Sequence, residues 1–230
     1  MNKIKIKILS SLFSLILMLK VTGCDENGGI TIPSGSTELT ISTKSDHSFM
    51  NPPANVVITE VKALIHQVQF EQESNQNNQT ITFSPFVAYF NTNGSLRDMS
   101  TNYIIRDFYT KIKFQIHKPE ENETPSDPEF KEGTLSDKRY SFIIKGTYNG
   151  ISFIYKSKIS SNVVLSFNPT TNFNLKQMNV TVNFNELGWF KNGTQDLDPA
   201  NPQNAVIIDN NIKNSFKKVY LDNNKDGIPD

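Results

Sequence analysis

Apolar and polar residues alternate with a period of two along most of the chain beyond residue 37. The most regular run is residues 108–117, where Phe108, Ile112 and Phe114 share one parity and are predicted to face the core. Alternation of this kind is typical of a half-buried antiparallel strand. The same period predicts further strands at residues 38–43, 56–70, 80–90, 139–148, 151–159, 163–167 and 178–184.

Turn chemistry supports these strands at two places. Asn149 and Gly150 lie between two alternating runs, and they predict a tight hairpin because a type I′ turn needs positive φ at both positions. Pro85 interrupts its run and predicts an edge strand or a bend, because proline cannot donate a hydrogen bond to a neighbouring strand.

Residues 56–70 are the ambiguous segment. The parity of their apolar positions changes near His66 and Gln67, which indicates a bulge or a bend between sheets. A helix over residues 60–69 is the competing interpretation.

About eight strands with turn signals between them, and no helices alternating with them, predict an all-β protein. We expect one antiparallel β-sandwich over residues 37–220, which is large enough to need no disulfide. Apolar residues at helical spacing in residues 211–220 predict one short C-terminal helix: Ile212, Phe216 and Val219. Residues 119–137 are a long acidic loop with three prolines, either a functional excursion or a disordered insert.

The N-terminal residues carry the most specific functional signal. Three lysines precede an apolar run at residues 8–19, and the sequence Val-Thr-Gly-Cys follows it, ending at Cys24. Twelve residues at about 1.5 Å each reach about 18 Å, too short for a bilayer core of about 30 Å. Residues 1–23 are therefore predicted to be a signal peptide. The cleavage region resembles the bacterial lipobox, which implies a diacylated Cys24; an ordinary secretory signal with a chance cysteine is the alternative.

Acylation would hold the chain on a lipid bilayer through Cys24, since each buried CH₂ adds about 0.8 kcal/mol. Cys24 is the only cysteine, so the chain has no internal disulfide and no cysteine-ligated metal. Residues 24–36 are polar and contain glycine, serine and proline, which predicts a flexible tether. In lipoproteins that this chain resembles, acidic residues directly after the anchor bear on sorting. Asp25 and Glu26 therefore favour the outer membrane or the cell surface over the inner membrane.

The charge balance narrows the possible partners. The chain has 23 basic and 23 acidic residues, and residues 1–23 hold four lysines and no acidic residue. The mature chain therefore carries 19 basic and 23 acidic groups, without the cationic excess of a nucleic-acid binder. A hydrophobic content of 37% also excludes a protein with many membrane spans.

The sequence contains no motif of a nucleophile elbow, zinc protease, dinucleotide-binding loop or P-loop. His47, His66 and His117 are far apart and lack metal-ligand spacing, and His117 is expected to be a solvated surface residue. We therefore expect no enzyme, but a binding or structural module with an unknown protein or glycan ligand.

The final nine residues, from Asp222 to Asp230, follow the pattern Asp-x-Asn-x-Asp-Gly-x-x-Asp. Oxygen ligands at alternate positions surround a hard cation, and glycine permits the sharp turn. The spacing resembles the calcium loops of thrombospondin type 3 repeats, dockerins and EF-hands, which implies these calcium ligands: Asp222, Asn224, Asp226, the carbonyl of Ile228, and Asp230. The motif occurs once and lacks the downstream glutamate of an EF-hand. An acidic tail without a cation is therefore the alternative for residues 221–230.

Trp189 and Phe190 form the second candidate ligand site. An exposed aromatic pair on a β-sandwich can stack on sugar rings, which would make the protein a carbohydrate-binding or adhesin-like surface protein. A core plug is the alternative, because Leu187 is apolar as well.

The mature chain is similar to uncharacterised bacterial lipoproteins of β-sandwich families of unknown function. The similarity rests on Cys24 and its preceding motif, on the segments VKALIHQVQF, SPFVAYF and KRYSFIIKGTYNGISFIYKS, and on the ending LGWF, LDP, NNIKNSF and DNNKDG. The resemblance implies the fold but no activity.

Overall fold

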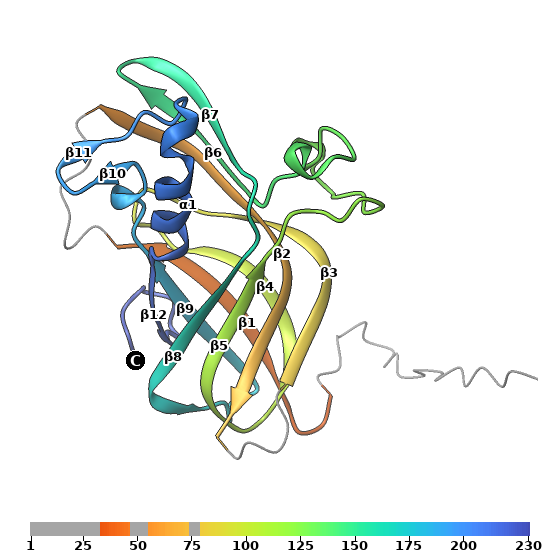
Figure 1. The fold of residues 1–230 in the computed structure, drawn as a ribbon. Coiled ribbons are helices and arrows are strands. Elements are labelled where there is room, and N and C mark those ends of the chain that lie inside the picture. Colours follow the sequence, from red (N-terminus) through yellow and green to blue (C-terminus); the bar gives the residue numbers. More distant parts are fainter. Residues whose placement is uncertain (1–32, 47–54, 74–78) are drawn as a thin grey trace, which may run out of the picture. The chain divides into compact units, whose positions relative to one another are not determined.

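The computed structural model describes residues 33–46, 55–73 and 79–230 (Figure 1). The predicted signal peptide, Cys24 and most of the predicted tether lie outside the described residues. Strands dominate the part that is described, with one α-helix, α1 (Ala205–Lys213), and four short 3-10 helices. The expected all-β class is therefore confirmed. None of the helices in the described ranges is both long and apolar enough to cross a membrane.

The first sheet has the strand order β12-β9-β1-β4. Its members are β1 (Ser36–Ser45), β4 (Arg97–Ile105), β9 (Gln177–Phe184) and β12 (Phe216–Leu221). β1 and β9 run parallel, whereas the other pairs in both sheets are antiparallel. The predicted antiparallel sandwich therefore contains one parallel pair, which the alternation of a single strand does not reveal.

The second sheet is built around the long strand β2. Its members are β2 (Val56–Gln72), β3 (Gln79–Tyr89), β5 (Phe108–Ile116), β6 (Phe142–Tyr148), β7 (Ile151–Ser157) and β8 (Ser161–Asn172). β3 pairs with one side of β2, while β6 and then β5 pair with the other side in succession. β7 pairs with β6, and β8 pairs with β5. Two further strands, β10 (Lys191–Asn192) and β11 (Gln195–Asp196), form a separate small hairpin.

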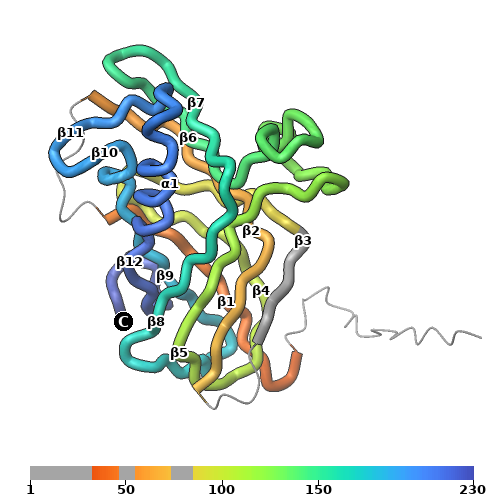
Figure 2. Tube along the Cα trace, in the orientation of Figure 1, coloured from red at the N-terminus to blue at the C-terminus, as the bar shows by residue number. Residues whose placement is uncertain are grey.

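The chain leaves the second sheet between β5 and β6, opposite Leu64 of β2. The amide of His117 donates to the carbonyl of Leu64, and the amide of Leu64 donates to the carbonyl of Ser141. β6 and β5 therefore pair with successive parts of the same side of β2, end to end. Residues 119–137 connect β5 to β6 (Figure 2).

Aromatic side chains fill the space between the two sheets. Phe184 of β9 lies 5.3 Å from Phe90 in an edge contact, and Phe90 lies 5.7 Å from Phe142 of β6, measured between ring centroids. Such pairs contribute about 0.5–1.5 kcal/mol each beyond the area they bury. The sheets also meet along their edges, where β12 contacts β8 and β3 contacts β4.

The bulge predicted near His66 and Gln67 is confirmed. The register of β2 shifts between Ile65 and Gln67 against both β3 and β5. This shift lets Ile65 and Val68 both face the core, with exposed fractions of 2% and 0%. The competing helix over residues 60–69 is wrong.

The two turn-chemistry predictions are also confirmed. Asn149 and Gly150 have φ values of 52° and 78°, and Tyr148 pairs with Ile151 across the turn. Pro85 lies in β3, which pairs with β2 alone in its sheet and is therefore an edge strand.

Two predictions fail where bulges change the side-chain period. The register of β5 shifts between Tyr109 and Lys111, so Tyr109 is fully buried while Phe108 is 45% exposed, the reverse of the expectation. The predicted helix over residues 211–220 is misplaced: α1 ends at Lys213, and a strand, β12, follows. The register of β12 shifts between Phe216 and Lys218. Phe216 and Val219 are therefore three positions apart, a spacing that is also typical of a helix.

Candidate functional site

Residues 119–137, which we call the excursion, have a defined structure on the outer face of the second sheet. They include one 3-10 helix, Pro128–Phe130, and the start of a second, Ser136–Lys138. Asp127 caps the first helix by accepting a hydrogen bond from the amide of Glu129 at 2.9 Å. The excursion is therefore a folded part of the domain, and the alternative of a disordered insert is wrong.

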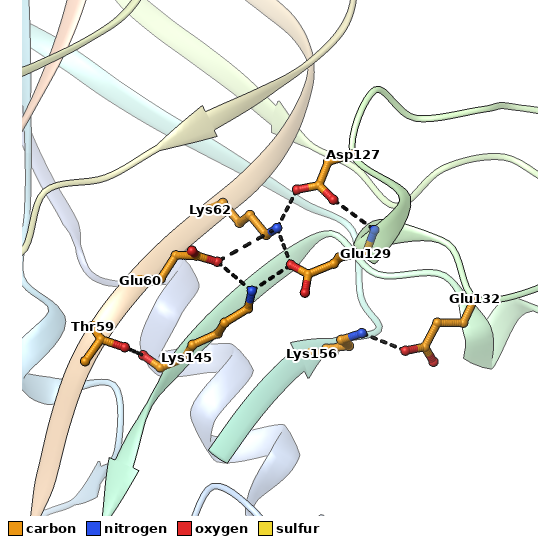
Figure 3. Close-up of polar contacts among 8 residues, drawn as sticks. All are labelled: Thr59, Glu60, Lys62, Asp127, Glu129, Glu132, Lys145 and Lys156. Carbon is orange, nitrogen blue, oxygen red and sulfur yellow. Dashed lines mark hydrogen bonds and ion pairs between the residues drawn. The ribbon is translucent and has the colours of Figure 1, made fainter. Parts of the chain in front are cut away.

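Lys62 of β2 lies at the centre of the contact between the excursion and the sheet (Figure 3). Its side chain points away from the main core, yet the residue is only 4% exposed because the excursion covers it. The ammonium contacts the carboxylates of Asp127 and Glu129 directly. A buried lysine of this kind is tolerated because it is paired on the excursion side.

Lys145 of β6 extends the network. Its Nζ lies 2.9 Å from Oε2 of Glu129 and 2.9 Å from Oε1 of Glu60, which belongs to β2 (Figure 3). Two lysines and three carboxylates from the excursion, β2 and β6 thus share one cluster.

Hydrogen bonds from Lys62 and Lys145 lower the pKa of Glu129 to about 2. Burial would lower the pKa of Lys62, but its hydrogen bonds to Asp127 and Glu129 outweigh burial and raise it. Glu129 and Lys62 are therefore held in their charged forms at neutral pH. A pair of this kind fastens two segments together and is poorly suited to proton transfer.

A small apolar cluster lies beside the ionic network. Phe130 of the excursion is fully buried against Leu64, Tyr140 and Ile143, with Val87 packed alongside. The ammonium of Lys62 lies 5.7 Å from the centre of the Phe130 ring. Burial of one such aromatic side chain stabilises a fold by about 1.5–3 kcal/mol, so the excursion is fixed by packing as well as by charge.

A third contact fixes the far part of the excursion. Glu132 accepts hydrogen bonds from Lys156 of β7 at 2.6 Å and from the hydroxyl of Tyr140 at 2.7 Å. These two partners lower the pKa of Glu132. Lysines on β2, β6 and β7 therefore each pair with a carboxylate of the excursion.

The structure brings together His66 and His117, which the sequence separates by fifty-one positions. Their ring centroids lie 4.8 Å apart, and Nε2 of His117 lies 3.2 Å from Oε2 of Glu123 in the excursion. His117 is only 7% exposed, so the expectation of a solvated histidine is wrong. The bulge at His66 brings the two histidines together, and the excursion covers His117. The spacing of histidines in the sequence predicts neither feature. His47 lies outside the described residues.

The C-terminal loop, residues 222–230, packs against the first sheet. Asp222 is fully buried and accepts hydrogen bonds from the hydroxyl of Thr181 at 2.7 Å and from the amide of Gly227 at 3.1 Å. Gly227 has a φ of +78°, which explains why glycine occupies this position. The loop therefore belongs to the folded domain and is not a separate tail.

The other predicted calcium ligands form hydrogen bonds within the loop. Asn224 accepts from the amide of Asp226 at 3.1 Å, Asp226 accepts from the amide of Ile228 at 2.8 Å, and Asp230 accepts from the amide of Asn223 at 2.7 Å. Across residues 33–46, 55–73 and 79–230, no three His, Cys, Asp or Glu side chains converge as metal ligands. Calcium binding stays a prediction.

Two lysines connect the C-terminal loop to the first sheet, one from β1 and one from the loop itself. Lys44 of β1 donates to the carbonyl of Gly227 at 2.9 Å, and Lys225 pairs with Asp98 of β4 at 2.7 Å. The hydroxyl of Tyr220 donates to the same carbonyl at 2.9 Å. These contacts attach the loop to three strands of the first sheet.

Trp189 and Phe190 are fully buried, each with an exposed fraction of 0%. Trp189 packs edge-on against Phe142 at 5.5 Å, and Phe190 packs edge-on against Phe153 at 5.3 Å. Sugar stacking requires an exposed ring face, so the predicted aromatic platform is wrong and the pair is the core plug that the sequence also allowed.

Comparisons with known proteins assign no family. No family model matches the chain, and no curated protein matches it. Among solved structures, the chain is similar to MbnP from Methylosinus trichosporium, with 7% sequence identity and a TM-score of 0.42. That similarity covers 67% of this chain and 77% of MbnP. A likeness at this level assigns neither fold family nor function.

Proposed function

We propose that this chain is a membrane-anchored bacterial lipoprotein whose β-sandwich is a non-enzymatic binding module at the outer membrane or cell surface. The observation that carries the proposal is the basic and apolar N-terminal segment that ends in Val-Thr-Gly-Cys24. Cleavage before Cys24 and acylation of its thiol would leave the domain attached by lipid alone.

The length of chain between the anchor and the domain supports presentation away from the bilayer. Twelve Cα-to-Cα steps lead from Cys24 to Ser36, where β1 begins. An extended chain spans at most about 3.5 Å per residue, so the tether reaches at most about 42 Å. That reach lets the domain clear the lipid headgroups and contact a partner.

The excursion supports a binding role because its conformation is already fixed. The ion pairs of Lys62 and the packing of Phe130 both hold it on the sheet. A surface that is ordered before it meets a partner loses less conformational freedom on binding. The fixed excursion is therefore suited to recognition, whichever molecule it contacts.

Metabolic labelling with a clickable palmitate analogue tests the anchor. The wild-type chain is expected to take up label and to sediment with membranes, because Cys24 supplies the only thiol. Cys24→Ser is expected to lose both properties. The double variant Cys24→Ser/Ser34→Cys is the matched control, since a thiol displaced from the cleavage motif should not restore labelling. A wild-type chain that stays unlabelled and soluble would refute the proposal.

A further inference from the structure

An open hollow of about 340 Å³ lies on the outer face of the second sheet, over β2, β5 and β8. Four amide side chains line it: Gln67, Gln69, Gln115 and Asn162. Three of them form one row across the sheet, because Gln67 pairs with Gln115 and Gln115 pairs with Asn162 in the strand register. The hollow has the size of a small-molecule site, which typically occupies about 300–1,000 Å³.

The amide groups of this row have unused hydrogen-bonding capacity. Within the described part of the chain, the four side-chain amides form no hydrogen bond to another protein group, and each is at least partly open to solvent. Each amide carries two N–H donors and one oxygen that can accept twice. Side chains that donate and accept at neighbouring points match a ligand whose own groups do both, as hydroxyl groups do.

The charge of the hollow argues against an ionic ligand. Lys113 is the one charged side chain among the described residues that line the hollow, and it pairs with Oε2 of Glu71 at 3.1 Å. Its positive charge is therefore matched within the sheet, and an anion gains little there.

The apolar content of the hollow argues against a protein partner. Val164 is 51% exposed, whereas the ring of Phe114 is turned into the core and only 4% exposed. Protein interfaces depend on buried aromatic or large apolar anchors, and a single valine does not supply one.

We propose that this hollow binds a neutral glycan, and this inference rests on the proposed role as a binding module. Gln67, Gln115 and Asn162 each donate to one sugar hydroxyl and accept from its neighbour, while Val164 contacts a C–H face of the ring. The site lies on the solvent-facing side of β2, β5 and β8 and is independent of the buried Trp189.

Affinity electrophoresis of the purified full chain tests the glycan site. Native gels would contain an α-glucan, a β-glucan, a galactomannan or a xylan, with alginate as the acidic comparison and a polyoxyethylene detergent that carries no sugar. At least one neutral polysaccharide is expected to slow migration at least twofold. Gln67→Ala/Gln115→Ala is expected to abolish this shift, whereas Gln195→Ala, an exposed amide of β11, is expected to keep it.

Three results would overturn the glycan site: no shift with any neutral polysaccharide, a shift with alginate alone, or an equal shift for the double variant. Thermal unfolding of each variant would show that the fold is intact, since all three substituted amides face solvent at least in part. Loss of the glycan site leaves palmitate labelling of Cys24 unchanged, whereas loss of labelling refutes the anchored module even if a glycan binds. The two failures are therefore distinguishable.

Discussion

The excursion and the C-terminal loop differ in what their central carboxylates contact: lysine on the second sheet for the excursion, and neutral groups on the first sheet for the loop. In the excursion, the carboxylates of Asp127 and Glu129 meet the ammonium of the buried Lys62. In the loop, the buried carboxylate of Asp222 meets a hydroxyl and a backbone amide. Two acidic segments can therefore be ordered by different means, and they should respond differently to mutation, cations and pH.

Removal of the apolar contact should have the largest effect on the excursion. Phe130→Ala is expected to lower the free energy of unfolding by about 3 kcal/mol, because it leaves a cavity among Leu64, Tyr140 and Ile143. Urea unfolding would measure the change. Leu135→Ala is the matched control in the same segment, where a 69% exposed side chain should change stability by less than about 0.5 kcal/mol. Equal effects of the two variants would show that the excursion is not packed on the sheet.

Removal of the central charge should come second. Lys62→Met keeps the apolar stem but leaves Asp127 and Glu129 without their shared ammonium, and it is expected to cost about 2 kcal/mol. Limited proteolysis should then cut within residues 119–137. Lys113→Met is the control, because its pair with Glu71 is more exposed and should contribute about 0–1 kcal/mol. If the excursion of Lys62→Met resists proteolysis as well as that of the wild type, the ion pairs of Lys62 do not hold it on the sheet.

Calcium should distinguish the loop from the excursion. If the side chains of Asp222, Asn224 and Asp226 bind Ca²⁺, calcium at five times its Kd is expected to stabilise the fold by about 1 kcal/mol. Differential scanning fluorimetry would show the rise in Tm, and Asp226→Asn should remove it. Asp137→Asn, an exposed acid of the excursion, should leave the rise unchanged. Absence of heat in a calorimetric titration at millimolar calcium would end the calcium prediction.

Acid should loosen the excursion locally. The pKa of Glu129 is about 2 in the folded protein against an ordinary value of 4.5, so its contribution is present above pH 4.5 and is lost as the pH falls toward 2. Cleavage of residues 119–137 by pepsin is expected to increase across that window. Glu129→Gln has no carboxylate at this position and should show a smaller dependence on pH. Identical pH profiles for the two proteins would show that Glu129 does not contribute.

Features that depend on neighbouring positions in the chain could be predicted from the sequence. The hairpin at Asn149 and Gly150 follows from backbone conformations that few residues adopt, and the bulge at His66 follows from a change of parity. β4 and β12 were not predicted. Met99 and Ile104 are separated by polar residues in β4, and a register shift disguises the period of β12.

The structure of the excursion could not be predicted from its own composition. Its acidic residues and prolines resemble those of a disordered segment, while the lysines that order it lie on β2, β6 and β7. Which strands lie side by side decides whether Lys62, Lys145 and Lys156 face the same segment. The meeting of His66 with His117 depends on strand pairing in the same way.

The intact mass of the protein purified from its native membranes tests membrane anchoring most directly. The predicted mass is that of a chain beginning at Cys24 and carrying two or three acyl chains on that residue. A mass that includes residues 1–23 and an unmodified thiol would contradict the anchor and, with it, the proposed role outside the cytoplasm.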